Sequence, residues 1–178
     1  NNPSRCFFCK LELYSSLDKI SKESGIEVVF NGTNIDDLGD YRPGNKAAKQ
    51  IKVVSPLLEC SISKSEIRDI ALFFGLDNWS KPAQPCLASR VPYGTEITMN
   101  ILKQIEDAEN YLHDLGFKNF RVRNHGSVAR IELEESDFKM LLNKKLRFGI
   151  DEKFRKLGFN FVSLDLRGFK SGSLNSEI

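Results

Sequence analysis

Apolar side chains recur at helical spacing at the start of the chain and then cluster in β-branched runs. Residues 8–24 predict an amphipathic helix, and the runs at 26–30 and 52–58 predict two short strands. Ser63 and Glu66 form the pattern of a capping box, which predicts the start of a further helix. Because these elements follow one another without tight hairpins, they favour an α/β fold with a parallel sheet. Two strands make no stable parallel sheet, so we expect further strands upstream of residue 1.

The pattern changes beyond a proline-rich stretch, which we interpret as a linker between two domains. The predicted domains are 1–80 and 98–178, joined by the linker 81–97. In the second domain we expect, in order, a helix capped by Thr98, strands at 117–123 and 128–133, a helical stretch that Ser136 caps, and a strand at 160–166. We expect the helical stretch to break near 148–149 and to continue to Leu157. This α-β-β-α-β order would become ferredoxin-like with one more strand in front of it.

The charge balance limits the classes of partner. The formal net charge of the 178 residues is +2, and basic and acidic side chains nearly balance in both halves of the chain. We therefore expect no nucleic acid partner on electrostatic grounds. We expect neither a membrane span nor a signal peptide, because no apolar run is long enough for a bilayer. The four cysteines are too few and too unevenly spaced for a secreted disulfide framework, so we expect a cytoplasmic protein with reduced thiols.

Cys86 lies in a loop that prolines stiffen. Pro82, Pro85 and Pro92 fix their own backbone angles and favour extended conformations before them, so we expect no helix directly before Cys86. Arg90 follows within reach, and a cation close to a thiol favours the reactive thiolate. A buried structural cysteine is the alternative, but the polar surroundings favour a presented thiol.

A polar loop follows the first predicted strand, at the edge where open α/β sheets bind ligands. Glycine would let the backbone approach a phosphate, threonine offers a hydroxyl, and carboxylates are ligands that Mg²⁺ prefers. The residues predicted to bind nucleotide and Mg²⁺ are Gly32, Thr33, Asn34, Asp36 and Asp37, with Asp40 as a further carboxylate. The alternative is an acidic loop whose aspartates cap helices, and composition alone favours this alternative.

Arg121 and Arg123 share one face of a predicted strand, where they could clamp a phosphate or a carboxylate. The alternative is a solvated face on which they pair with Glu132 and Glu134 across the turn. The pattern favours neither.

Cys6 and Cys9 form a Cys-x-x-Cys pair, but without a second pair the prediction of a zinc site is weak. We expect these two cysteines to pack into a core. His113 and His125 lack metal-ligand spacing, and we expect both at the surface.

Five motifs, taken together and in order, resemble those of the LarE family of ATP-dependent sacrificial sulfur transferases, within the PP-loop pyrophosphatase group. The motifs span nearly the whole chain, and they are Arg5–Lys10, Gly32–Gly44, Ser55–Leu58, Cys86–Gly94 and Gly168–Asn175. The resemblance implies an α/β fold in which a truncated PP-loop (adenine nucleotide alpha hydrolase-like) domain precedes a small ferredoxin-like α+β domain. It also implies that residues 98–178 bind the substrate.

The resemblance implies a sequence of reactions that uses ATP and Mg²⁺. A carboxylate of a pyridinium biscarboxylic acid mononucleotide is adenylated, and Cys86 displaces AMP to form a thioester. Elimination then cleaves the cysteine Cβ–S bond, which leaves dehydroalanine in the protein and a thiocarboxylate on a product that feeds the nickel-pincer nucleotide cofactor.

The resemblance also implies roles for individual residues. Arg121 and Arg123 would hold the substrate phosphate, Ser89 and Arg90 would lie beside the reactive cysteine, and Glu109 and Glu132 would line the site. One branch of the family has extra cysteines and binds an iron–sulfur cluster. Cys86 is the only cysteine after Cys60, so we favour the sacrificial branch and expect no metal site made by the protein alone. We also expect a homo-oligomer.

One departure from the family is serious, because its nucleotide loop, Ser-Gly-Gly-x-Asp-Ser, is absent from these 178 residues. We therefore expect the chain as given to be incomplete in the adenylation step. An RNA-binding module and a structural domain built around cysteine-bound metal remain as alternatives of other classes.

Overall fold

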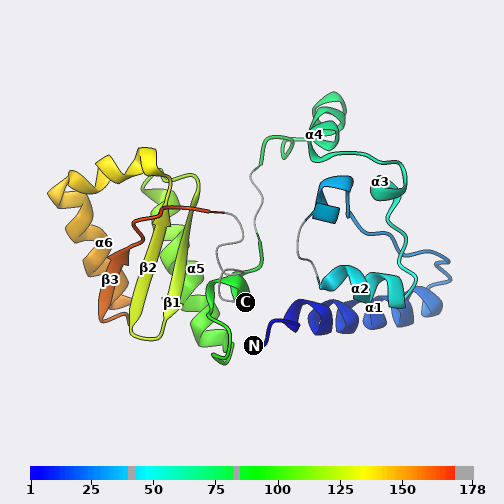
Figure 1. Cartoon of the computed structure of the whole chain (residues 1–178), viewed down its shortest axis with the longest axis horizontal. Helices are drawn as coiled ribbons and strands as arrows, with labels where there is room; N and C mark the ends of the chain where they lie inside the picture. Colours follow the sequence, from blue (N-terminus) through cyan, green and yellow to red (C-terminus); the bar gives the residue numbers. More distant parts are fainter. Residues whose placement is uncertain (40–42, 82–84, 171–178) are drawn as a thin grey trace. The chain divides into compact units, whose positions relative to one another are not determined.

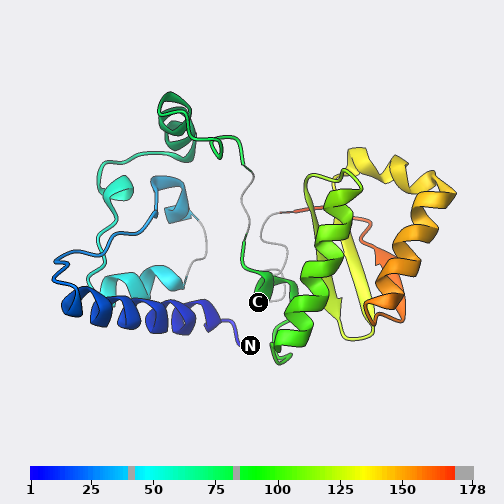
Figure 2. The same ribbon diagram turned by 180° about the vertical axis from the view of Figure 1, so that it is seen from behind.

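The computed structural model of the chain describes residues 1–39, 43–81 and 85–170. The chain divides into two compact units, one formed by Asn2–Lys81 and the other by Asn1 together with Pro82–Ile178. Figures 1 and 2 show the chain from opposite sides. Each unit is described by itself below.

The unit Asn2–Lys81 is mainly helical. Its elements are α1 (Arg5–Glu23), the 3₁₀ helix η1 (Ile35–Gly39), α2 (Gly44–Gln50), α3 (Pro56–Glu59) and α4 (Lys64–Phe73). Helix α1 packs along α2, as both views show. The buried part of this contact is small and consists of Tyr14, Ala47 and Ala48. The helix predicted at 8–24 is confirmed with an earlier start.

The prediction of two strands in this unit is wrong. They reduce to one isolated parallel bridge between Phe30 and Val54. The second run ends early because Pro56 occupies the first turn of α3, a position that suits its fixed φ and missing N–H. The bridge keeps the predicted parallel direction, but it has no further strand beside it among the described residues.

The capping box of α4 is confirmed. The Ser63 side chain accepts a hydrogen bond from the Glu66 backbone N–H, and the Glu66 side chain accepts one from the Ser63 backbone N–H. Together they satisfy two backbone donors that a helix start leaves unpaired.

The second unit contains a three-stranded sheet. Its elements are η2 (Leu87–Arg90), α5 (Met99–Asp114), β1 (Phe120–His125), β2 (Val128–Leu133), η3 (Glu135–Leu142), α6 (Lys144–Lys156) and β3 (Phe161–Leu164). The strand order is β1-β2-β3, with β1 antiparallel to β2 and β2 parallel to β3. Figures 1 and 2 show α5 and α6 on one face of the sheet, while the segment after β3 crosses the other face.

The core of this unit lies between the sheet and the two helices. Val122 and Ile131 face each other in the β1–β2 register and pack with Leu112 of α5 and Phe154 of α6. Alternation along β1 therefore directs its odd-numbered arginines to the opposite face. The Thr98 cap of α5 is confirmed, since the Thr98 hydroxyl accepts the Ile101 N–H at 3.2 Å.

The predicted cap and break of the following helical stretch are wrong. The regular helix α6 begins after Asn143, whose side chain accepts the Leu146 N–H at 3.1 Å, and Ser136 lies within η3. Gly149 lies inside α6 without breaking it. A Cβ at this position would lie 3.3 Å from Tyr111 Oη, so the glycine leaves room for a side chain of α5.

The described residues do not form a ferredoxin-like sheet. In that topology a preceding strand would lie between the hairpin and the last strand. Here β2 and β3 are hydrogen-bonded directly to each other, so a preceding strand could not lie between them. The fold is a mixed α/β arrangement with a small three-stranded sheet. Over residues 1–39, 43–81 and 85–170, no helix has the length and apolar character to cross a membrane.

Candidate functional site

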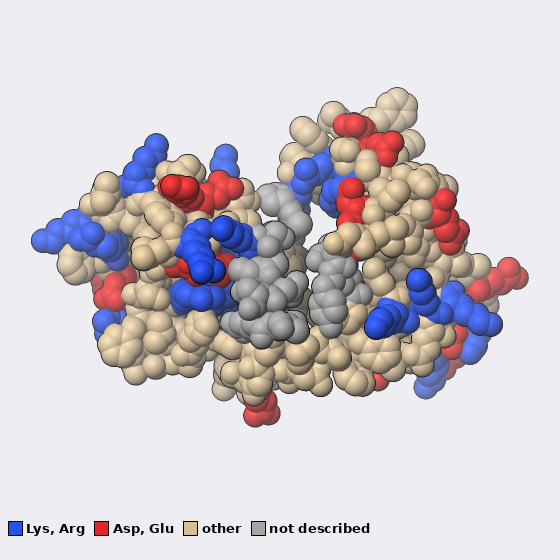
Figure 3. Space-filling view, in the orientation of Figure 1, with Lys and Arg blue, Asp and Glu red and all other residues tan. Residues whose placement is uncertain are grey.

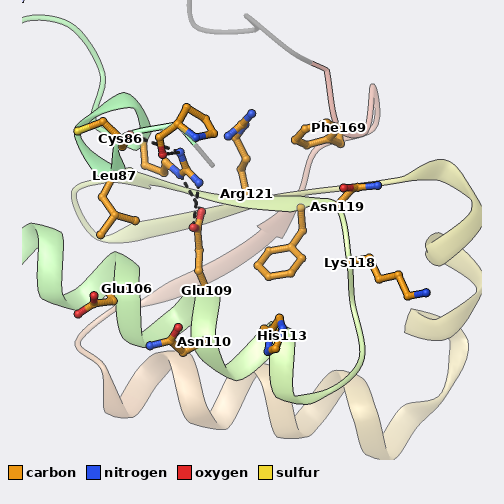
Figure 4. Close-up of a pocket in the computed structure, with 13 residues that line it drawn as sticks. Cys86, Leu87, Glu106, Glu109, Asn110, His113, Lys118, Asn119, Arg121 and Phe169 are labelled. Carbon is orange, nitrogen blue, oxygen red and sulfur yellow. Dashed lines mark hydrogen bonds and ion pairs between the residues drawn. The ribbon is translucent and has the colours of Figure 1, made fainter. Parts of the chain in front are cut away.

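Cys86 is one of the residues that line a pocket in the second unit. The sulfur-bearing side chain is exposed, and the pocket has a volume of about 450 Å³. It is lined by residues of the η2 loop, helix α5, strand β1 and the segment after β3, as Figure 4 shows. The lining residues are Pro85, Cys86, Leu87, Arg90, Glu106, Glu109, Asn110, His113, Lys118, Asn119, Phe120, Arg121 and Phe169.

Arg90 joins the cysteine loop to α5. Its Nε and Nη2 donate to the two carboxylate oxygens of Glu109 at 2.9 and 3.0 Å. Its Nη1 donates to the Pro85 carbonyl oxygen at 2.9 Å, to the Cys86 carbonyl oxygen at 3.4 Å and to Ser89 Oγ at 3.0 Å. Arg90 therefore binds the main chain of the loop rather than the sulfur of Cys86.

Glu109 also reaches β1, because its Oε1 accepts the Val122 N–H at 3.0 Å. One carboxylate thus fixes the η2 loop and the strand that carries Arg121 to the same helix.

Arg123 is joined to Glu132 of the neighbouring strand. Its Nε and Nη2 donate to the two carboxylate oxygens at 2.8 and 2.9 Å, and its Nη1 donates to the Ser89 carbonyl oxygen at 2.6 Å. Both side chains of this pair are buried. The alternative of a solvated, paired face is therefore right about the pairing of Arg123 with Glu132 but wrong about solvation, because both side chains are buried. Glu134 pairs with neither arginine and instead accepts a hydrogen bond from Asn119 at 2.6 Å.

Arg121 is also buried, at 7% exposure, and it lines the pocket. Within the part of the chain that the structure describes, its guanidinium has no hydrogen bond or ion pair. The Phe169 ring lies close to it, with its centroid 4.8 Å from the guanidinium carbon. Figure 4 shows both side chains at the same end of the pocket.

The charge of Arg121 is poorly compensated. Burial, and then the neighbouring charges of Arg90 and Arg123, lower the pKa of Arg121 to about 10. Glu109 and Glu132 act in the opposite direction, but each is already bound to another arginine. At neutral pH the group remains protonated, so this corner of the pocket favours an anion.

The pocket thus combines an exposed thiol with a buried cation that has spare hydrogen-bond donors. A thiolate is a nucleophile, and a guanidinium binds phosphate or carboxylate. The structure brings together Cys86, Ser89, Arg90, Glu109, Glu132, Arg121 and Arg123, which the sequence predicted as catalytic or substrate-binding residues. The roles of these residues stay predictions.

The predicted nucleotide loop belongs to the other unit. Asn34 is buried, and its backbone N–H donates to Asp37 Oδ2 at 3.0 Å. Asp36 Oδ2 accepts the Lys64 N–H at 2.6 Å, at the start of α4. These two carboxylates therefore act as caps, which is the alternative that composition favoured.

Asp36 and Asp37 serve as caps in the described part of this loop, and the predicted binding of nucleotide and Mg²⁺ stays a prediction. Gly32 has no positive φ, and no atom lies within 4 Å of where a Cβ would stand, so nothing in the described surroundings requires a glycine. The Thr33 N–H donates to Asn31 Oδ1 at 3.0 Å, as in a local turn. Asp40 lies outside the described residues. No group of three or more potential metal ligands occurs in residues 1–39, 43–81 and 85–170, so we derive no step through Mg²⁺.

The cysteines differ from expectation in one respect. Cys6 and Cys9 are exposed on α1 and do not pack into a core, because the buried stripe of this helix passes through Tyr14. His113 and His125 are exposed, as predicted.

Sequence reasoning missed several pocket residues. Glu106, Asn110 and His113 share the pocket face of α5 with Glu109, and their spacing of three, four and seven residues is the signal that could have found them. Phe169 lies within a motif that the sequence singled out, but no local pattern predicts that its ring lies beside Arg121.

On the face shown in Figure 3, acidic and basic side chains are interspersed.

No protein-family model matches the chain. Among curated proteins, an uncharacterized protein of Synechocystis sp. is 45% identical over 175 residues, which cover 98% of this chain and 65% of that protein. An uncharacterized protein of Methanocaldococcus jannaschii is 33% identical over 171 residues, which cover 96% of this chain and 66% of that protein.

A third relative carries a functional name. The pyridinium-3,5-bisthiocarboxylic acid mononucleotide synthase of Lactiplantibacillus plantarum is 39% identical over 181 residues, which cover 100% of this chain and 64% of that protein. The chain thus spans slightly less than two thirds of the length of these three relatives. By this similarity, it is a homologue, along its whole length, of a protein named as a pyridinium-3,5-bisthiocarboxylic acid mononucleotide synthase.

Proposed function

We propose that this chain is the cysteine-bearing part of a LarE-like sulfur transferase that acts on a pyridinium mononucleotide. The observation that carries the proposal is one pocket that holds both the exposed Cys86 thiol and the buried guanidinium of Arg121, which lacks a protein hydrogen-bond partner in the described residues. The homologue named as a bisthiocarboxylic acid mononucleotide synthase supports the same substrate class. A mononucleotide offers the phosphate that Arg121 could bind, and its pyridinium carboxylate is the group to be converted.

The framework residues have distinct parts in this proposal. Arg121 binds the substrate phosphate through its free N–H donors. The Arg90–Glu109 and Arg123–Glu132 pairs hold the η2 loop against α5 and β1, so that the thiol and Arg121 keep a fixed separation. Such preorganisation lowers the entropic cost of bringing a nucleophile to its target.

The proposed chemistry balances without an external oxidant or reductant. ATP supplies an adenylyl group to the carboxylate and releases pyrophosphate. The Cys86 thiolate attacks the acyl carbon, the thioester bond forms, and AMP leaves with the electron pair of the broken C–O bond. Removal of the Cys86 α-proton then expels the thiocarboxylate, because the Cβ–S bond breaks and its electron pair stays on sulfur. Residue 86 is left as dehydroalanine.

Adenylation needs residues beyond those described. The unit Asn2–Lys81 has one bridge in place of a sheet and exposes large apolar side chains, among them Phe73 at 84% and Phe74 at 70%. An exposed apolar surface of this extent is typical of a face that another polypeptide segment covers. We propose that this unit is part of a PP-loop nucleotide domain, completed by a segment that carries the nucleotide loop.

The test uses the protein extended upstream to include a nucleotide loop. After turnover with ATP, Mg²⁺ and the pyridinium biscarboxylic acid mononucleotide, intact-protein mass spectrometry should find the loss of the mass of hydrogen sulfide. Peptide mapping should locate dehydroalanine at residue 86. Cys86→Ser should abolish the thiocarboxylate product, whereas the control Cys60→Ser should not, because Cys60 is exposed in the other unit. Product formation with Cys86 intact would contradict the sacrificial mechanism.

A further inference from the structure

The contact between Arg121 and Phe169 is not explained by the framework described above. Arg90 and Arg123 are each held by two charge-assisted hydrogen bonds to a carboxylate. Arg121 has no such bond among the described residues, and yet it is buried to 7% exposure. A flexible cationic side chain in such a place needs something to hold its orientation.

An aromatic ring can hold a guanidinium without occupying its donors. A cation near a ring face is attracted by the quadrupole of the ring. The N–H groups of a guanidinium lie around its edge, so a ring over the plane leaves them open to an anion. The 4.8 Å separation between the Arg121 guanidinium carbon and the Phe169 centroid lies within the range of this interaction.

The backbone around Gly168 determines where this ring lies. After β3, the Asp165 N–H donates to the Ile131 carbonyl oxygen at 2.8 Å, and the Gly168 N–H donates to the Asp165 carbonyl oxygen at 3.1 Å. The Phe169 N–H then donates to the Leu133 carbonyl oxygen at 2.7 Å, at the end of β2. The segment is thereby attached to the sheet just before the ring.

Glycine is required at this attachment. Gly168 has φ +66°, and a Cβ there would lie 2.8 Å from the Leu133 carbonyl oxygen, which belongs to backbone and cannot turn aside. A larger residue would have to push the segment off β2 and would move the Phe169 ring with it.

We propose that Phe169 is a positioning residue for an anion site at Arg121, and that Gly168 holds it in place. The ring holds the guanidinium where its donors line the pocket. The ligand class is a phosphate monoester. The inference rests on the proposed function in one respect only, which is that the phosphate monoester is the mononucleotide substrate.

The first test measures anion binding by isothermal titration calorimetry. Inorganic phosphate and nicotinic acid mononucleotide, a pyridinium phosphate monoester, are titrated into the chain. Phe169→Leu keeps the apolar volume but removes the ring, and should raise the dissociation constant about fivefold to tenfold. Phe169→Tyr keeps the ring and should bind as the parent does. The matched control is Phe161→Leu, which removes a 61% exposed ring from β3 of the same unit and should leave binding unchanged.

The second test asks whether Phe169 acts through Arg121. In an Arg121→Gln protein, Phe169→Leu should weaken phosphate binding no further. In the parent, the Arg121 Nε–Hε signal in NMR spectra should be sharp and shifted by the ring, and this shift should disappear in Phe169→Leu but not in Phe169→Tyr. Gly168→Ala should also weaken binding although the ring is retained, which keeps the proposal testable should Phe169→Leu fail to fold.

Each outcome is decisive for one of the two proposals. Unchanged phosphate affinity in a folded Phe169→Leu protein, or an equal loss in the Arg121→Gln background, would overturn the positioning role. Phosphate binding that depends on Phe169, in an extended protein that transfers no sulfur, would remove the proposed function and leave the positioning role standing. Sulfur transfer with an unchanged KM in Phe169→Leu would remove the positioning role alone.

Discussion

Three arginines of like charge lie in one site, but they differ in their partners. Arg90 and Arg123 each bind a carboxylate through Nε and Nη2 and carbonyl oxygens through Nη1, whereas Arg121 has no carboxylate partner among the described residues and lies beside the Phe169 ring. A buried ion pair contributes little net stability compared with apolar packing, but removal of one partner leaves a costly unpaired charge. The main effect of the Arg90–Glu109 and Arg123–Glu132 pairs is therefore to hold the η2 loop, α5 and the sheet in a fixed arrangement.

This difference leads to a prediction for Glu132, which is 1% exposed. Glu132→Gln keeps the shape but removes the negative charge that pairs with Arg123, so the free energy of unfolding should fall by about 3–5 kcal/mol. Urea denaturation measures the change. Glu134→Gln is the matched control, since Glu134 bonds to Asn119 at an exposed position and should change stability by less than about 0.5 kcal/mol. Equal losses in the two variants would contradict the argument.

At this scale the sequence predicts that Arg121 and Arg123 share a face and offers Glu132 as a partner, but it does not predict which of the two arginines Glu132 binds. Strand alternation alone directs Arg121 and Arg123 to one side. In the register, Glu132 lies directly opposite Arg121, yet its carboxylate binds Arg123 on the diagonal. Arg123 also donates to the Ser89 carbonyl oxygen and Arg121 lies beside Phe169, and both of these neighbours come from segments distant in sequence.

At the scale of elements, the helices with side-chain caps were the predictable ones. Ser63 and Thr98 begin α4 and α5 where the sequence indicates, because a cap is a local hydrogen bond between residues three apart. The strands of the first unit were not predictable, because a strand needs a neighbour whose backbone completes its hydrogen bonds. Asn143 displaced Ser136 as the cap of α6 because η3 occupies the residues between them.

The capping box of α4 predicts a titration. Hydrogen bonds from the Ser63 backbone, and then from its side chain, lower the pKa of Glu66. Because the pKa is lowered in the folded protein, the ionised Glu66 side chain stabilises the fold fully at pH values above the ordinary pKa of a glutamate. This stabilisation is lost as the pH falls through the lowered pKa. Side-chain NMR should find Glu66 titrating below the ordinary range of a glutamate, and Ser63→Ala should return it toward that range. A Glu66 titration that is insensitive to Ser63→Ala would show that the cap does not form in solution.

At the scale of the whole molecule, the two units differ in how much core they have. The second unit buries Leu112, Phe117, Phe154 and Phe159 almost completely, whereas the buried cluster of Asn2–Lys81 consists of Tyr14 and two alanines. The sequence pattern indicated two regions of different character. It did not indicate that the two strands predicted in the first region would pair through only one bridge. The predicted domain boundaries and the predicted homo-oligomer stay predictions.

The sparse core of Asn2–Lys81 leads to a measurable expectation. The chain should bind the dye ANS, because large apolar side chains such as Phe73 are exposed in this unit. The protein extended upstream should bind several-fold less dye per molecule, since the added segment would cover that surface. Phe161→Leu in the other unit provides the control and should change dye binding little. Equal fluorescence from the chain and the extended protein would contradict the proposed completion of this unit.

The hydrogen bonds from Arg90 to main-chain carbonyl oxygens affect what the protein can still bind after one turnover. The guanidinium holds Pro85 and Cys86 by groups that remain after the sulfur is gone. On the proposed chemistry, a molecule that has given up its sulfur keeps an intact pocket and an unchanged Arg121. Each spent copy would then compete with fresh copies for the same mononucleotide, so the yield of product would depend on how quickly used protein is removed, and not only on how much is made.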